Sequence, residues 1–392
     1  MISRFLRPAR LLALAIFAFP IRAFSAGGAG PEGVAALTVY VGSYSAADQP
    51  GIHQLSLDRA TGELRPVGRT TGLGNPSFLA FHPSHRYLYA VSEVSDFGGT
   101  KTGAVAAFAV DGKTGALTLL NRQASEGDGP CHLTVDPEGR HVLVANYGGG
   151  TAAVLPIAAD GRLRPATSVV RHQGSGPNRS RQEGPHAHSI DLDRAARFAL
   201  VADLGLDKVM VYRFDPKGTL TAHEPPSASL APGSGPRHLA FHPSGSFAYA
   251  INELSSTVAA FAYDPGQGTL RSVESVSTLP ADFKGENYPA EIAVSSDGRF
   301  LYGSNRGHDS IAAFAVDASS GRLRPIGHTP TGGSWPRHFA LDPTGSYLLA
   351  ANQKSDSVVV FRIDRKTGAL APTGHRIELP KPVCVIIRPA SE

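Results

Sequence analysis

Histidine, arginine and glutamate side chains recur beside a short phrase that repeats along the chain. In the copy at residues 235–242, a proline is followed directly by Arg237 and a histidine, and the apolar run at residues 247–252 is followed by Glu253. Imidazole and carboxylate groups can accept and return protons, and guanidinium groups can bind anions or stabilise an oxyanion. The pattern therefore predicts acid–base chemistry on a small polar substrate.

Some of these residues differ from what the other copies of the phrase carry, and we expect those residues to do the chemistry. The predicted catalytic residues are His188, Glu253, Arg237 and Arg306. Either His188 or Glu253 would transfer protons, whereas the two arginines would stabilise negative charge. The predicted substrate-binding residues are His186, His132, Asn305, Arg337 and Gln353.

The residues that do recur have a structural alternative. A histidine such as His132 can cap the end of a strand by hydrogen bonding, and an asparagine such as Asn305 can form a turn. The sequence alone leaves both interpretations open at these positions.

The repeat predicts the fold. Its leading proline recurs about every 50 residues, which is a period typical of β-propellers. Each unit contains short apolar runs separated by turn residues, and it is interpreted as four antiparallel strands. The leading prolines are Pro76, Pro130, Pro185, Pro236, Pro289, Pro336 and Pro382.

Segments from the two ends of the chain are expected to form one blade together. Residues 383–388 fit only the first strand of a unit, whereas residues 37–64 supply the later strands. Together they predict an all-β, seven-bladed propeller with four-stranded antiparallel blades, closed by the terminal strands in one blade. Such closure removes an open sheet edge. We expect a single domain over residues 37–390.

The topology of a blade predicts where the candidate residues meet. The first two strands are joined by a tight turn, so the start of one and the end of the other lie at the same rim. Counting from the turns places Pro236 opposite Asn252 and Pro289 opposite Arg306. A polar insertion at residues 172–184 leads into this rim, and it is either a lid or a solvated loop between blades.

The N-terminal segment has the pattern of a signal peptide. Arg4, Arg7 and Arg10 precede an apolar run at residues 11–19, and the small residues Ala23 and Ser25 fit a cleavage site. The run is too short to span a membrane. We expect cleavage after Ser25, a short linker at residues 26–36, and a periplasmic or secreted protein with no membrane attachment after cleavage.

Charge and cysteine content limit the classes of partner, metal and cofactor that we expect the protein to bind. The chain has 37 Lys and Arg against 33 Asp and Glu, and four of the basic residues precede Ala26. The remaining charges balance, so neither nucleic acid nor an anionic membrane is an expected partner. Cys131 and Cys384 have no zinc-type spacing and are interpreted as small buried residues. We expect no cofactor and no metal, with calcium on the polar rim as the alternative.

Several motifs resemble the lactonase family of seven-bladed β-propellers, which includes the propeller-type 6-phosphogluconolactonases. The resemblance runs from Leu37 to Pro389. The motifs are Pro185-His186-Ala187-His188-Ser189, Gly235-Pro236-Arg237-His238, Asn252-Glu253-Leu254, Ser304-Asn305-Arg306 and Ala351-Asn352-Gln353-Lys354-Ser355. The resemblance implies a site of one histidine, two arginines and one glutamate, which fall here on His188, Arg237, Arg306 and Glu253.

The resemblance also implies an activity, which is hydrolysis of a sugar δ-lactone by attack of water on the lactone carbonyl. The enzyme would be 6-phosphogluconolactonase-like or gluconolactonase-like, with a small-molecule lactone as its partner, and we expect a monomer. A carboxymuconate lactonising enzyme and a non-catalytic propeller that binds a ligand or protein are the alternatives. An exported protein would meet unphosphorylated lactones, whereas a cytoplasmic one would serve the pentose phosphate pathway. The sequence therefore does not decide whether the substrate carries a phosphate group.

Overall fold

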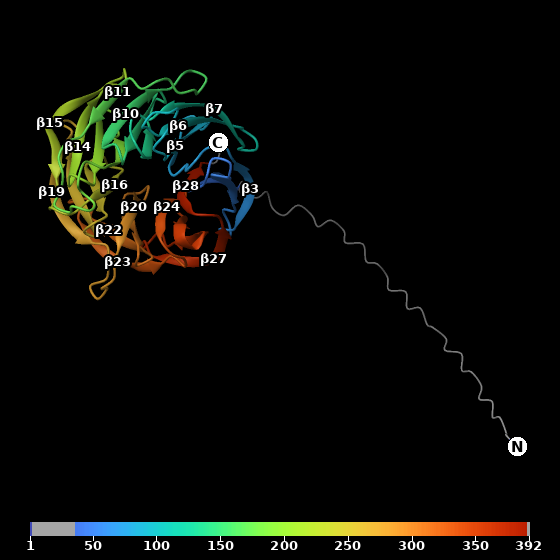
Figure 1. The fold of residues 1–392 in the computed structure, drawn as a ribbon. Coiled ribbons are helices and arrows are strands. Elements are labelled where there is room, and N and C mark those ends of the chain that lie inside the picture. The colour runs from blue at the N-terminus through green and yellow to red at the C-terminus, as the bar shows by residue number, and fades with distance from the viewer. Residues whose placement is uncertain (2–35, 390–392) are drawn as a thin grey trace. The chain divides into compact units, whose positions relative to one another are not determined.

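Seven four-stranded antiparallel sheets are arranged in a ring in the computed structural model of the protein (Figure 1). The structure describes Met1 and residues 36–389. Apart from Met1, the predicted signal peptide lies outside these residues, as does the predicted linker up to residue 35. The predicted seven-bladed, all-β fold is confirmed.

Each sheet forms one blade, and its strands follow one another from the axis of the ring outward. Blade 1 contains β28 (Pro382–Arg388), β1 (Leu37–Ser43), β2 (Ile52–Leu57) and β3 (Leu64–Thr70). Blade 2 contains β4 (Leu79–Phe81), β5 (Tyr87–Ser92), β6 (Ala104–Val110) and β7 (Leu117–Ala124). Blade 3 contains β8 (Pro130–Val135), β9 (His141–Asn146), β10 (Thr151–Pro156) and β11 (Ser168–Arg171). Blade 4 contains β12 (Ala187–Leu192), β13 (Phe198–Asp203), β14 (Lys208–Phe214) and β15 (Leu220–Ser229). Blade 5 contains β16 (Pro236–Phe241), β17 (Phe247–Asn252), β18 (Thr257–Asp264) and β19 (Thr269–Ser277). Blade 6 contains β20 (Tyr288–Val294), β21 (Phe300–Arg306), β22 (Ser310–Val316) and β23 (Leu323–Pro330). Blade 7 contains β24 (Pro336–Leu341), β25 (Tyr347–Asn352), β26 (Ser357–Ile363) and β27 (Leu370–Glu378).

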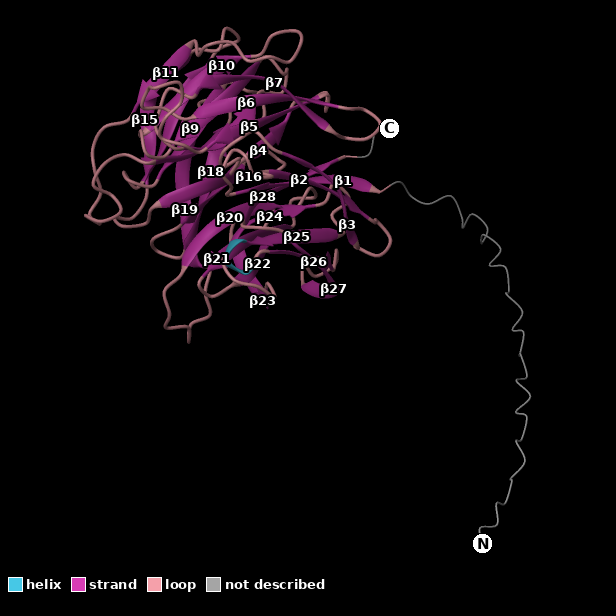
Figure 2. Cartoon of the chain, turned by 45° about the vertical axis from the view of Figure 1, so that its right-hand side comes forward, coloured by secondary structure: helices cyan, strands magenta, loops and turns pink. Residues whose placement is uncertain are grey.

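Burial explains why these segments form strands. The second strand of a blade packs between two neighbouring blades, so every residue of β17 is buried and the strand is an almost unbroken apolar run. The outermost strands face solvent on one side, and every residue of β27 is exposed or half-buried. Among the described residues the one helical element is the short η1 (Gln353–Ser355), and no helix there is long and apolar enough to cross a membrane (Figure 2).

Blade 1 closes the ring as predicted. The C-terminal β28 pairs antiparallel with β1, with Val385 opposite Val41 and Ile387 opposite Val39. A buried apolar cluster then joins blade 1 to blade 7, and Val385 and Leu349 both belong to it. The two ends of the described chain therefore hold the propeller together through strand pairing and core packing.

We expect truncation after Leu379, which removes β28, to lower Tm by about 10 °C or more. The buried side chains of Val383, Val385 and Ile387 would be lost from the core, and each contributes about 1.5–3 kcal/mol on burial. Circular dichroism melts would measure the change, with a chain that ends at Pro389 as the control. Equal melting temperatures for the two chains would contradict the closing role of β28.

The register of the first strands corrects two details of the sequence interpretation. Pro236 pairs with Asn252 as predicted, but Pro289 pairs with Asn305 rather than with Arg306. The first strand of blade 6 contains a β-bulge, so straight counting from the turn is wrong by one residue. In blade 4 the first pair between the two inner strands is Ala187 with Asp203, so Pro185 lies outside the paired strand.

Candidate active site

Three predicted site residues occupy the same structural position in three different blades. In β12, β16 and β24 the register shifts by one residue directly after the first paired residue. The extra residue is His188 in β12, Arg237 in β16 and Arg337 in β24. A β-bulge redirects a side chain and is common beside functional sites. The bulges thus explain how a regular fold presents one histidine and two arginines from equivalent positions.

A second group of predicted residues lies where the second strand of a blade ends. Glu253 follows β17 directly, Arg306 is the last residue of β21, and Gln353 follows β25. Because the starts of the first strands lie opposite these strand ends, both groups belong to one rim of the propeller. This is the rim that the sequence predicted.

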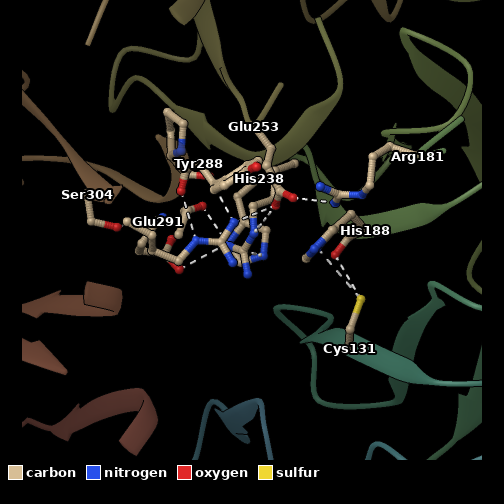
Figure 3. Close-up of polar contacts among 12 residues, drawn as sticks. Cys131, Arg181, His188, His238, Glu253, Tyr288, Glu291 and Ser304 are labelled. Carbon is tan, nitrogen blue, oxygen red and sulfur yellow. Dashed lines mark hydrogen bonds and ion pairs between the residues drawn. The ribbon is translucent and has the colours of Figure 1, made fainter. Parts of the chain in front are cut away.

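Glu253 is the centre of the cluster (Figure 3). It is 4% exposed, and three guanidinium groups contact its carboxylate. Arg306 Nη2 donates to Oε2 over 2.6 Å, and Arg181 Nη2 donates to Oε1 over 2.5 Å. Arg237 Nε lies 3.3 Å from Oε2. Arginines from three separate segments therefore meet at one buried anion.

Backbone carbonyls fix the two arginines that come from strands. Arg306 Nε donates to the carbonyl of Tyr288 over 2.8 Å, and Arg237 Nη1 donates to the carbonyl of Ala290 over 2.6 Å. Both acceptors belong to β20, the first strand of blade 6. The two guanidiniums are thus held in place by the carboxylate of Glu253 and by one strand of the neighbouring sheet.

The three arginines determine the charge state of Glu253. Burial raises the pKa of this carboxyl group, but Arg306, Arg237 and Arg181 outweigh the effect of burial and hold the pKa at about 2. Burial, together with Arg306 and Arg337, lowers the pKa of Arg237 to about 9. At neutral pH Glu253 is therefore an anion and a weak proton acceptor, and Arg237 remains a cation.

Acid unfolding should depend on Glu253. Its folded-state pKa is depressed from 4.5 to about 2, so its contribution to stability is fully present above pH 4.5 and is lost as the pH falls towards 2. We expect the Tm of the wild type to fall more steeply over this range than that of Glu253→Gln, measured at constant ionic strength. The exposed Glu138→Gln serves as the control, and identical slopes for wild type and Glu253→Gln would contradict the assignment.

His188 lies beside the cluster. It is 6% exposed, and its ring packs against the rings of Tyr147 and His238 with centroids 5.3 Å apart in each case. Within the described residues, the ring makes one hydrogen-bonding contact, in which Nδ1 lies 3.7 Å from Cys131 Sγ. Burial, followed by the charges of Arg237 and His238, holds the pKa of His188 well below 6.5. The imidazole is therefore neutral, and its Nε2 has no hydrogen-bond partner among the described residues.

Two further histidines connect the first strands of neighbouring blades. His132 Nδ1 accepts a hydrogen bond from the Ile190 N–H over 3.2 Å, and His338 Nδ1 accepts one from the Val385 N–H over 3.2 Å. Because the backbone donor takes the lone pair of Nδ1, the ring proton of each neutral imidazole lies on Nε2. This geometry favours the structural alternative for His132, in which the histidine joins two strands by hydrogen bonding.

Asn305 is not brought into the cluster. It is fully buried, its Nδ2 donates to the carbonyl of Thr278 over 2.7 Å, and its Oδ1 accepts from Asn287 Nδ2 over 3.0 Å. These bonds hold the connection between blades 5 and 6. The turn-forming alternative therefore describes Asn305 better than the predicted contact with substrate.

The other predicted binding residues lie around the cluster. His186 Nδ1 donates to the carbonyl of Tyr147 over 3.0 Å, and the two rings stack with centroids 4.4 Å apart. Arg337 Cζ lies 5.3 Å from the centre of the Tyr44 ring, and no carboxylate of the described residues forms an ion pair with this arginine. The Oε1 atom of Gln353 is buried without a hydrogen-bond partner in the described part of the chain. Arg337 and Gln353 thus retain binding capacity.

Arg181 is a site residue that the sequence interpretation did not single out. It belongs to the polar insertion at residues 172–184, and its contact with Glu253 carries that insertion onto the rim. This contact favours the lid interpretation of the segment over a solvated loop. The sequence did offer one signal, because this arginine lies in a polar insertion directly before the strand that carries His188.

Both cysteines are buried, as the sequence predicted, and neither forms a disulfide. Cys131 lies beside His188, and Cys384 Sγ lies 4.0 Å from His338 Nε2. Within the residues that the structure describes, no three His, Cys, Asp or Glu side chains come together as possible metal ligands.

Comparison with known proteins places this architecture in a family. The family model described as "Lactonase, 7-bladed beta-propeller" matches residues 38–387. The chain belongs to this family. It is accordingly a lactonase-class enzyme, which is a kind of carboxylic-ester hydrolase.

Relatives and solved structures agree with the family. A 6-phosphogluconolactonase of Bacillus subtilis is 40% identical over 295 residues, which cover 75% of this chain and 82% of the relative. A 6-phosphogluconolactonase of Formosa agariphila is 35% identical over 302 residues, covering 75% of this chain and 83% of the relative. The structure of a periplasmic gluconolactonase of Pseudomonas aeruginosa is 35% identical, with a TM-score of 0.84 over 90% of this chain and 99% of the other.

Proposed function

We propose that this lactonase hydrolyses sugar δ-lactones at the rim formed by His188, Arg237, Glu253 and Arg306. The observation that carries the proposal is the juxtaposition of a neutral, buried imidazole with two guanidiniums held on one carboxylate. Ester hydrolysis needs a proton acceptor for water and cations for the developing oxyanion. The names of the relatives support a sugar lactone as the substrate.

His188 is the better candidate for the general base. Both carboxylate oxygens of Glu253 are engaged by guanidiniums, and its pKa of about 2 makes it a poor proton acceptor. His188 is neutral, and its Nε2 makes no hydrogen bond within the described residues, so in the tautomer with the proton on Nδ1 it can accept a proton. In this mechanism water adds to the lactone carbonyl while His188 takes its proton. Arg237 and Arg306 stabilise the oxyanion, the bond between the carbonyl carbon and the ring oxygen breaks, and the imidazolium returns the proton to that oxygen.

Arg337 is the candidate for recognising negative charge on the ligand. Arg181, Arg237 and Arg306 are all engaged with Glu253, whereas Arg337 forms no such pair among the described residues. A single free guanidinium suits the carboxylate of the hydroxy-acid product. A phosphate dianion is usually bound by more than one donor group. This charge balance supports an unphosphorylated sugar lactone as the main substrate.

The proposed location agrees with that substrate. The pattern at residues 1–25 predicts export and cleavage after Ser25, and one of the related structures is of a periplasmic protein. Mass spectrometry of the mature N-terminus from the native host would test the location. A chain that starts at Ala26 would support export, whereas an intact Met1 would return 6-phosphogluconolactone to first place.

The activity is tested by direct comparison of two lactones. We expect the purified protein to hydrolyse δ-gluconolactone faster than its spontaneous opening, with a higher kcat/KM than for the 6-phosphate. A pH-stat assay with subtraction of the uncatalysed rate would measure both. If neither lactone is turned over above background, the proposed substrate class is wrong and a binding function at the same rim becomes the better explanation.

A further inference from the structure

A groove opens beside the Glu253 cluster, over blade 5. It encloses about 470 Å³, within the range of roughly 300–1,000 Å³ found for small-molecule sites. Two of its lining residues also belong to the cluster: Arg181 donates to Glu253, and the carbonyl of Tyr288 accepts from Arg306. Figure 3 shows both residues beside Glu253. We call this hollow the blade-5 groove, and it adjoins the proposed reaction site through Arg181 and Tyr288.

Two unusually long connections between blades build the groove. The segment from blade 3 to blade 4 spans residues 172–186, and the segment from blade 5 to blade 6 spans residues 278–287. The equivalent connections at residues 230–235, 331–335 and 379–381 are much shorter. Both long segments contribute to the lining of the groove, which includes Asn178, Ser180 and Arg181 from the first and Gly285, Glu286 and Asn287 from the second. The groove therefore exists because these two segments rise on either side of blade 5.

Buried amides fix the walls of the groove. The side chain of Gln182 is fully buried, and its Nε2 donates to the carbonyl of Leu204 over 2.9 Å and to Asp207 Oδ1 over 2.8 Å. On the other wall, Asn287 Nδ2 donates to Ser256 Oγ over 3.1 Å. A hollow with walls held in this way is ready to bind without first ordering its loops, which lowers the entropic cost of binding.

The lining matches the surface of a sugar ring. Tyr288 and Leu254 are the lining residues with large apolar side chains, and tyrosine combines an aromatic face with a polar hydroxyl. The guanidinium of Arg181 and the carboxylate of Glu286 offer a donor and acceptors for hydroxyl groups. A pyranose presents C–H faces surrounded by hydroxyls, and this mixture of contacts complements it.

We propose that the blade-5 groove binds a second sugar ring, so that the enzyme acts on δ-lactones of disaccharide-derived aldonic acids. The proposal rests on the sugar-lactone hydrolysis proposed above. The reaction is unchanged: water adds to the lactone carbonyl, the bond to the ring oxygen breaks, and the glycosidic bond stays intact. The groove supplies binding energy from the part of the substrate that does not react.

The test compares cellobiono-δ-lactone with δ-gluconolactone. We expect kcat/KM to be about tenfold higher for the disaccharide lactone, which corresponds to about 1.4 kcal/mol of added binding. Ser180→Trp places a large side chain in the groove and should raise KM for cellobiono-δ-lactone about tenfold more than KM for δ-gluconolactone. Ser175→Trp, in the same insertion but outside the lining, is the matched control and should leave both constants unchanged.

The outcomes separate this proposal from the one on which it rests. Absence of δ-gluconolactone hydrolysis by the wild type would overturn the proposed function itself. Normal δ-gluconolactone hydrolysis without preference for cellobiono-δ-lactone would overturn the groove alone. Melting temperatures of both tryptophan variants exclude misfolding, and Glu286→Ala provides a second, smaller change that should also raise KM selectively for the disaccharide lactone.

Discussion

Replacing Arg306 by alanine is expected to lower kcat/KM for δ-gluconolactone by about 10²–10³-fold, which is the usual cost of removing one oxyanion donor. The guanidinium of Arg306 is held by Glu253 and by the carbonyl of Tyr288, so it is fixed before the substrate arrives. Arg181 and Arg237 would still neutralise Glu253 in the variant. The loss should therefore appear in kcat/KM, with only a small change in Tm.

Two controls give this prediction its specificity. Arg306→Lys keeps the charge but loses the planar fork that serves Glu253 and the backbone together, so it should recover only part of the activity. Arg322→Ala removes an arginine whose side chain is 62% exposed on the outside of blade 6, and it should have no effect. A variant Arg306→Ala with wild-type kcat/KM would show that the oxyanion is stabilised elsewhere.

The sequence contained enough information for the fold because the repeat reports backbone positions. Prolines, turns and apolar runs return in each unit, and the terminal segments complement each other, so seven blades and the closure by β28 could be predicted. The same repeat singled out His188 and Arg237, because they depart from it. The sequence did not show that both residues lie at a β-bulge. A bulge shifts the register of a strand by one residue without changing its composition.

The part of the site that the sequence could not predict lies outside the repeat. Arg181 reaches Glu253 only because buried Gln182 anchors the insertion to Leu204 and Asp207. No periodicity predicts such a contact. Asn305 illustrates the opposite case, in which a polar residue at a rim position is used by the connection between blades.

The choice between Glu253 and His188 as the base likewise depends on three-dimensional charge. A glutamate and a histidine are both ordinary proton acceptors by type. The convergence of three guanidiniums keeps the pKa of Glu253 at about 2, whereas burial and neighbouring cations keep His188 neutral. In the proposed mechanism Glu253 therefore positions Arg237 and Arg306, and His188 takes the proton.

His188→Gln is therefore expected to lower kcat for δ-gluconolactone by about 10²–10⁴-fold, which is the typical contribution of a positioned general base. Because Gln keeps a polar side chain of similar reach, KM should change much less than kcat. The half-buried His375 on the outer strand β27 provides the control variant His375→Gln, which should leave kcat unchanged. Initial rates at saturating substrate, corrected for spontaneous opening, would measure the effect.

The pH dependence distinguishes a base from a merely structural histidine. Burial and the charges of Arg237 and His238 keep the pKa of His188 well below 6.5, so the imidazole stays unprotonated as the pH falls through 6.5. The wild-type kcat should then remain constant below neutrality and decline only at pH values well under 6.5, where protonation removes the base. His188→Gln should lack this acid limb. An acid limb that persists unchanged in His188→Gln would assign the titrating group to another residue and return Glu253 to consideration as the base.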